Sequence, residues 1–191
     1  MLAGNGFKDV INMAGGIKAW NSNQAIGSED LGLQLFTGRE PPQETLVVAY
    51  SLEEGLREFY VSMIPGVKNE NARQLFEKLA AIEVKHQDRI FAEYCRITGT
   101  DVNRDEFEKE VVVPAMEGGL TTEQYLKLYQ PDLEVVEEVI SLAMAIEAQA
   151  LDLYQRASER AASEESRGTL MQIANEERAH LAQLGKLFER P

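Results

Sequence analysis

The sequence predicts an all-α four-helix bundle, built from two repeated helical hairpins that a long crossover joins and preceded by a short irregular N-terminal leader. Apolar residues recur every three to four positions over four long segments, which is the pattern of helices with one buried face. The second pair of segments repeats the first at an offset of 94 residues. Such self-similarity at a fixed offset indicates an internal duplication.

Four long helices are expected, over residues 42 to about 65, about 69–98, 132 to about 162, and about 164–188. Pro42 suits the first turn of its helix, because proline has no amide hydrogen to lose there. Gly99 stops the second helix. The crossover of residues 100–131 contains a short helix over Thr122–Leu128, since the threonine pair before it resembles a helix start. One long crossover between two hairpins is the ferritin-like connection.

The two histidines of the chain close the same four-residue pattern, Glu-x-x-His, once in each hairpin. Residues three apart lie on one helix face, so each pattern directs a carboxylate and an imidazole to one point. A single glutamate precedes each pattern by 30 residues, about the length needed to turn and return to the same height. The candidate metal ligands are therefore Glu53, Glu83, His86, Glu147, Glu177 and His180.

All six candidates interrupt an apolar stripe, where a leucine is expected. Ionised glutamates without partners are very unfavourable in such a place. Two divalent cations would neutralise four carboxylates, so the pattern predicts a dinuclear metal site. Carboxylate and imidazole ligands suit iron, manganese or zinc. The alternatives are a metal-free bundle with protonated or paired carboxylates, and a ligand choice one residue away, at Glu54 or Glu176.

Composition limits the function classes. The formal net charge of −13 argues against nucleic acid or an anionic membrane as a partner. Cys95 is the only cysteine, so neither an intramolecular disulfide nor a four-cysteine iron site can form, and packing is its expected role. No apolar run approaches the roughly 20 residues of a membrane span, and no signal-peptide layout is present. We therefore expect a cytoplasmic protein.

The six candidates, in this order and at matched spacing over residues 43–191, resemble the rubrerythrin branch of the ferritin-like di-iron proteins. The resemblance implies two bound iron ions. It implies that Glu83 and Glu177 bridge them and that each remaining glutamate and histidine binds at one end, namely Glu53, Glu147, His86 and His180. It also implies that Tyr60 and Tyr154 hydrogen-bond ligand carboxylates. The alternative for both tyrosines is an ordinary core position with a satisfied hydroxyl.

Three features depart from typical rubrerythrins. Ala150 stands where they carry an extra glutamate, three residues after the third-helix ligand. The four-cysteine module that delivers electrons is missing. Residues 6–20 resemble the closing strand and helix of a rhodanese sulfurtransferase, which assigns residues 1–42 to a rhodanese-like remnant and linker. Sulfur transfer is not expected, because the cysteine that would form the persulfide is absent.

The resemblance implies a non-haem di-iron oxidoreductase that reduces hydrogen peroxide or dioxygen. Its electrons would come from a separate donor protein, since the chain has no redox-active cysteine cluster. The alternative is an iron-binding, iron-handling or adaptor bundle with little turnover, which Ala150 and the missing electron-transfer module favour. A third interpretation is a metal-free structural bundle. By analogy with ferritin-like bundles, we also expect a homodimer.

Overall fold

The computed structural model describes residues 31–99, 102–110, 116 and 119–188 of the chain. Helices form most of these residues, and no strand occurs among them. The all-α prediction is therefore confirmed. The segment of residues 6–20 lies outside the described residues. None of the helices in the described ranges combines the length and the apolarity that a membrane crossing requires.

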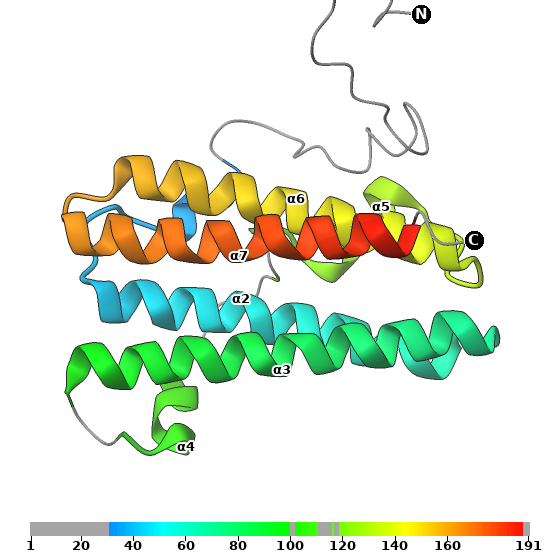
Figure 1. Cartoon of the computed structure of the whole chain (residues 1–191), viewed down its shortest axis with the longest axis horizontal. Coiled ribbons are helices and arrows are strands. Elements are labelled where there is room, and N and C mark those ends of the chain that lie inside the picture. Colours follow the sequence, from blue (N-terminus) through cyan, green and yellow to red (C-terminus); the bar gives the residue numbers. More distant parts are fainter. Residues whose placement is uncertain (1–30, 100–101, 111–115, 117–118, 189–191) are drawn as a thin grey trace, which may run out of the picture.

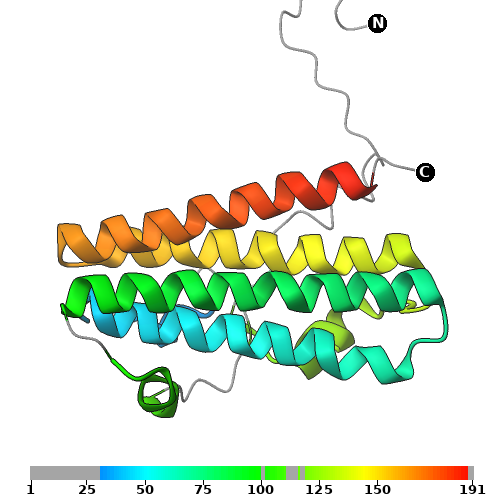
Figure 2. The same ribbon diagram turned by 60° about the horizontal axis from the view of Figure 1, so that its bottom comes forward.

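Four long helices form the bundle: α2 (Pro42–Met63), α3 (Glu70–Thr98), α6 (Val136–Arg160) and α7 (Glu164–Phe188). Helices α2 and α3 pack along each other as one antiparallel hairpin, and α6 and α7 form the other (Figure 1). Figure 2 views the same molecule from another direction and again shows the second hairpin lying along the first. The shorter elements are η2 (Leu33–Leu35), η3 (Ile64–Gly66), α4 (Arg104–Phe107), η4 (Glu108–Glu110) and α5 (Thr122–Tyr129).

Local capping interactions explain where the helices begin and end. The Asn69 side chain accepts hydrogen bonds from the backbone amides of Asn71 and Ala72 and so caps α3. At the other end Gly99 has a φ of 65°, a left-handed conformation that glycine adopts easily. The predicted start of α5 is also confirmed, because Thr121 forms a capping box with Gln124.

Helix α6 starts at Val136, four residues later than predicted. Residues 132–135 form a turn instead, in which the Val135 amide donates to the Asp132 carbonyl. The Glu134 carboxylate accepts hydrogen bonds from the amides of Lys68 and Asn69, at 2.6–3.0 Å. This contact between the hairpins holds the turn and delays the helix.

Part of the predicted leader packs against the bundle. Leu33 and Phe36 are buried, and the Phe36 ring meets Tyr154 edge-on, with centroids 6.1 Å apart. Gly38 has a φ of 78°, and a Cβ there would lie 2.6 Å from the Arg160 carbonyl oxygen, so only glycine fits. The boundary between residues 42 and 43 stays a prediction, but the described end of the leader contributes to the core.

Two hydrophobic clusters fill the bundle. The first cluster contains residues from the C-terminal half of α2 and the N-terminal half of α3, together with their neighbours on α6 and α7: Leu56, Phe59, Phe76, Ile146 and Leu184 are examples. The second cluster lies toward the other end and includes Leu46, Tyr50, Ile90, Leu153 and Ile173. On every long helix, the candidate ligands lie between the residues of one cluster and those of the other. A polar layer therefore divides the core.

Candidate metal centre

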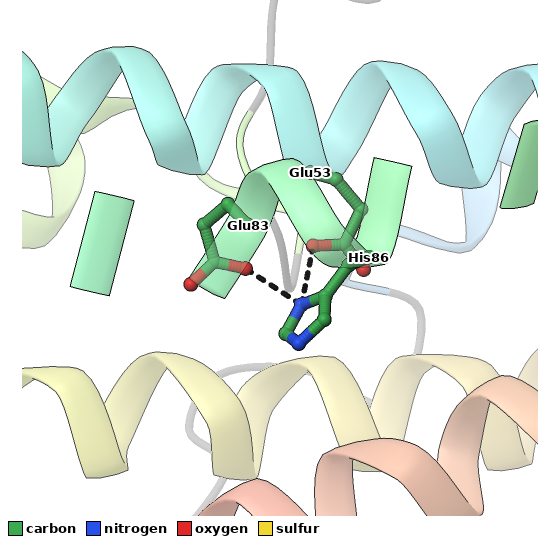
Figure 3. Close-up of side chains that lie close together, drawn as sticks. All are labelled: Glu53, Glu83 and His86. Carbon is green, nitrogen blue, oxygen red and sulfur yellow. Dashed lines mark hydrogen bonds and ion pairs between the residues drawn. The ribbon is translucent and has the colours of Figure 1, made fainter. Parts of the chain in front are cut away.

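The first hairpin brings three candidate ligands together. Glu53 on α2 meets Glu83 and His86 on α3, and their ligand atoms lie within 4.8 Å of one another. Nδ1 of His86 is 2.7 Å from Glu83 Oε2 and 3.3 Å from Glu53 Oε2. Figure 3 shows the imidazole between the two carboxylates. The Glu-x-x-His spacing on one helix face produces this arrangement, as the sequence predicts.

The second hairpin repeats the arrangement. Glu147 on α6 meets Glu177 and His180 on α7, again with ligand atoms within 4.8 Å of one another. Nδ1 of His180 is 3.0 Å from Glu177 Oε2 and 3.5 Å from Glu147 Oε2. The duplication seen in the sequence is thus also a duplication of side-chain geometry.

The two groups face each other across the bundle. The rings of His86 and His180 stack with centroids 4.0 Å apart and an interplanar angle of 9°. The two triads therefore form one cluster of four carboxylates and two imidazoles. This convergence is the condition that a dinuclear site requires.

Burial makes the cluster unfavourable without cations. The four glutamates and His86 are at most 3% exposed, and His180 is partly buried. Glu83 Oε1 is buried and has no hydrogen-bond partner among the described residues. Glu83 Oε2 and Glu147 Oε2 are also buried, and they approach Nδ1 of His86 and of His180 outside hydrogen-bond geometry. Buried carboxylate oxygens without donors are rare in folded proteins. Metal ions would complete their coordination, so the residues present fit a pair of cations.

In the metal-free cluster, bound protons neutralise part of the negative charge that cations would otherwise neutralise. Burial raises the pKa of Glu83 well above its ordinary value, and the charges of Glu53 and Glu147 add to the effect. Burial opposes the charged form of His86, but contacts with Glu53 and Glu83 outweigh it and raise the pKa of His86 to about 10. Burial also acts to raise the pKa of Glu147, yet contacts with His180 and Glu177 dominate and lower it.

These shifts predict how the stability of the metal-free protein depends on pH. The pKa of His86 rises from 6.5 to about 10 on folding, so its contribution is complete below about pH 6.5 and is lost as pH rises toward 10. The raised pKa of Glu83 acts in the same direction, because deprotonation then favours the unfolded chain. Between pH 6.5 and 9 the free energy of unfolding falls by about 3 kcal/mol through His86 alone, which lowers the melting temperature by ~5–10 °C.

Melting curves in EDTA at both pH values test this prediction. Metal-loaded protein is the control, because cations replace the protons and its melting temperature should change little over this range. A metal-free melting temperature that rises with pH would contradict the assigned contacts of His86.

The sequence also singles out two tyrosines, one alanine and two further glutamates near the candidate ligands. The rings of Tyr60 and Tyr154 are fully buried, one in each hydrophobic cluster, and their hydrogen bonding to ligand carboxylates stays a prediction. Ala150 is also fully buried, in the second cluster. Glu54 and Glu176 belong to neither triad, and Glu176 pairs with Arg89 at 2.8 Å.

A cavity beside the triads was not predicted from the sequence. It has a volume of about 200 Å³, lies between α3 and α7, and reaches Glu83, Glu147 and His180. Lys78 and Lys186 also line it. They lie close in sequence to candidate ligands but off the apolar stripe, so a helical-face pattern alone gives no reason to single them out.

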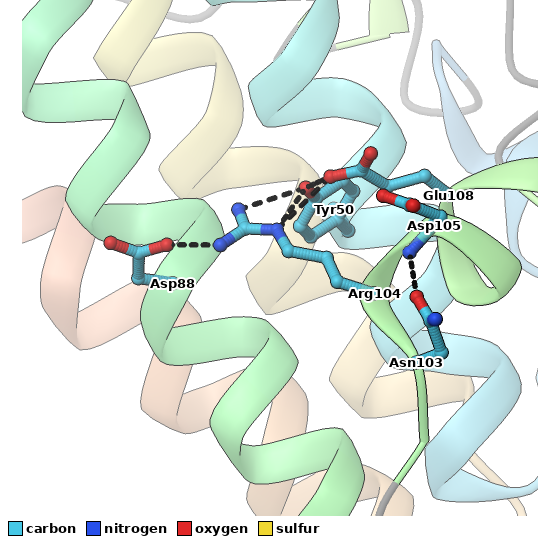
Figure 4. Close-up of polar contacts among 6 residues, drawn as sticks. All are labelled: Tyr50, Asp88, Asn103, Arg104, Asp105 and Glu108. Atoms are coloured by element: carbon cyan, nitrogen blue, oxygen red, sulfur yellow. Dashed lines mark hydrogen bonds and ion pairs between the residues drawn. The ribbon is translucent and has the colours of Figure 1, made fainter.

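A second polar cluster, around Arg104, has a structural role. Arg104 lies on α4 and bonds Glu108 at 3.0 Å, the Tyr50 hydroxyl at 3.0 Å and the Asp88 carboxylate (Figure 4). Burial raises the pKa of Tyr50 to about 12, aided by its hydrogen bond to Glu108. The cluster thereby attaches the start of the crossover to α2 and α3.

Two helical hairpins joined by a crossover, with a buried cluster of carboxylates and imidazoles at their centre, define the ferritin-like class of four-helix bundles. The rubrerythrin family profile matches residues 44–189, which is more than half of the chain and includes all six candidate ligands. The chain belongs to the rubrerythrin family, whose members typically bind iron. No curated protein and no solved structure matches it significantly. Since the family match does not extend to residues 6–20, their likeness to a rhodanese stays a prediction.

Proposed function

We propose that this protein is a non-haem di-iron oxidoreductase that reduces hydrogen peroxide or dioxygen with electrons from a separate donor protein. The convergence of six buried ligands into two matched triads is the observation that supports it most. A site of this composition has enough negative charge to hold two divalent cations and enough imidazole to fix one on each side.

Each hairpin would hold one iron ion through its own histidine. His86 and Glu53 would bind one ion, His180 and Glu147 the other, with the glutamates of the two Glu-x-x-His patterns between them. When bound and reduced, the two ions would supply one electron each to the O–O bond of the oxidant. The two hydrophobic clusters lie on either side of the site and limit its contact with bulk water. The cavity between α3 and α7 gives a small oxidant a path to Glu83, Glu147 and His180.

Electrons for a second turnover would come from outside the chain. The sequence has a single cysteine, which cannot form an iron–sulfur cluster of its own. A reduced iron–sulfur protein is the class of donor that fits. The homodimer and the cytoplasmic location stay predictions from analogy and composition.

Iron handling with little turnover is the second candidate function. Ala150 favours it, because a fully buried methyl group in the second cluster stands where typical rubrerythrins have an additional carboxylate. Without that carboxylate the site has one ligand fewer with which to adjust when the iron ions change charge.

Repeated turnover distinguishes the two functions. Protein loaded anaerobically with two equivalents of Fe(II) is mixed with hydrogen peroxide and an excess of a reduced iron–sulfur protein. An oxidoreductase consumes many equivalents of peroxide, whereas an iron-handling protein oxidises its iron once and then stops. Glu177→Gln should reduce the turnover rate by at least ~100-fold, in line with the loss of a metal ligand.

Glu176→Gln is the matched control, because Glu176 is the neighbouring residue but pairs with Arg89 outside the triads. It should turn over at close to the rate of the unchanged protein. Equal loss in both variants, or a single oxidation without cycling, would contradict the oxidoreductase proposal.

A further inference from the structure

The cavity beside the triads is larger than hydrogen peroxide or dioxygen requires. Its volume is about 200 Å³. One water molecule occupies ~30 Å³ of the liquid, and a dry apolar cavity of ~150 Å³ is large enough to bind benzene. The cavity therefore accommodates an organic group in addition to the two oxygen atoms of a peroxide.

Most of the cavity wall is apolar. Its hydrophobic lining residues come from α3 and α7 and are Leu75, Leu79, Ile82, Leu184 and Leu187. Each methylene group that such a wall removes from water strengthens binding of a ligand by about fourfold. A wall of this kind favours an alkyl chain over a small, strongly hydrated molecule.

Two lysines place positive charge at the margin of the cavity, whose lining also includes the carboxyl groups of Glu83 and Glu147. Lys78 on α3 and Lys186 on α7 line it, and both residues are exposed at its margin. No ion pair joins either lysine to another side chain within the described ranges. In a chain with a net charge of −13, two cations without ionic partners at one cavity are an attractive place for an anion.

Both lysines are displaced from the triads along their helices. Lys78 precedes Glu83 by five residues, or ~7.5 Å along the helix, and Lys186 follows His180 by six residues, or ~9 Å. Because α3 and α7 run in opposite directions, both lysines lie toward the same end (Figure 1). A ligand that reaches both places has a reactive group and an anionic group about 8–9 Å apart.

We propose that this cavity binds the alkyl chain and carboxylate of a medium-chain organic hydroperoxide, with the carboxylate at Lys78 and Lys186 and the peroxide at the triads. The inference rests on the proposed function and names its substrate class. Reduction breaks the O–O bond, consumes two electrons and two protons, and releases the alcohol and water. When bound and reduced, two iron ions would supply these electrons, and the external iron–sulfur donor would reduce the ions again.

Octanoate binding tests the anionic site without turnover. Calorimetric titration of the metal-free full chain should detect binding of octanoate. The double substitution Lys78→Glu and Lys186→Glu should weaken it about tenfold or more, because charge-assisted contacts are lost. Octanol, which has the same chain without the charge, should lose less than about threefold. Lys127→Glu on α5 is the control, because it makes one such charge reversal, half the charge change of the double variant, at a place away from the cavity.

Filling the cavity provides a second variant. Leu187→Trp at the far end of the cavity from the triads should abolish binding of both octanoate and octanol. Turnover assays compare kcat/KM for a carboxylate-bearing organic hydroperoxide with kcat/KM for hydrogen peroxide. The lysine double variant should lower the first relative to the second by about tenfold.

The outcomes separate this inference from the proposed function. Peroxide turnover without any octanoate binding, or with binding that Lys127→Glu weakens equally, overturns the cavity assignment and leaves the oxidoreductase intact. Lysine-dependent octanoate binding without peroxide turnover supports the anionic site and refutes the hydroperoxide as its substrate.

Discussion

Two equivalents of zinc(II) or iron(II) are expected to raise the melting temperature of the metal-free protein by about 15 °C or more, and a chelator should reverse the gain. Each cation that binds the folded state at ~1,000 times its Kd stabilises that state by ~4 kcal/mol. For a protein of this size, each kcal/mol shifts the melting temperature by ~2–4 °C. The structural reason is that cations neutralise buried carboxylates whose oxygens include Glu83 Oε1, which has no donor among the described residues, and Glu147 Oε2, which has only the distant His180 Nδ1 at 3.5 Å.

Calorimetry with zinc is the most direct measurement, because zinc has no redox chemistry that would change during the scan. Glu177→Gln should remove most of the metal-dependent gain, whereas Glu176→Gln should keep it, since only the first residue belongs to a triad. If chelator and metal leave the melting temperature unchanged, the carboxylates are stabilised by protons and pairing alone, and the bundle is structural.

The sequence is sufficient to predict the positions of the six candidate ligands, because the features that place them are local. A three-residue spacing puts Glu83 beside His86 on any helix, and the 94-residue offset transfers the same geometry to Glu177 and His180. The helix ends at Asn69 and Gly99 follow equally from capping chemistry within a few residues of chain.

Features that depend on contacts between distant segments were not predictable in this way. The late start of α6 depends on the contact of Glu134 with the backbone before α3. The burial of Phe36 depends on Tyr154, more than one hundred residues later. Lys78 and Lys186 likewise line one cavity only because α3 and α7 lie next to each other, and no helical period specifies that arrangement.

Replacing both Glu-x-x-His glutamates with leucine, as Glu83→Leu and Glu177→Leu, is expected to stabilise the metal-free protein while abolishing metal binding. In the unchanged metal-free cluster four carboxyl groups face two imidazoles, so two of them have no imidazole of their own, and burial raises the pKa of Glu83 so that it is held in the apolar interior as a protonated acid. After the substitutions His86 retains Glu53 and His180 retains Glu147 as partners. Replacing a buried ion pair with apolar residues of similar volume is often neutral or stabilises a fold by about 1–4 kcal/mol, and this range applies here because each imidazole keeps one carboxylate and no buried charge is left unpaired.

Urea unfolding in EDTA measures the gain, and zinc titration should show that the metal-dependent shift has disappeared. Glu176→Leu is the control, because it makes the same substitution one position away, at the partner of Arg89, and should change stability by less than about 0.5 kcal/mol. A double variant less stable than the unchanged protein would mean that hydrogen bonds of the glutamates maintain the fold without metal. A more stable double variant would mean that four buried carboxylates destabilise the apolar seam, as expected of residues whose role is to bind cations.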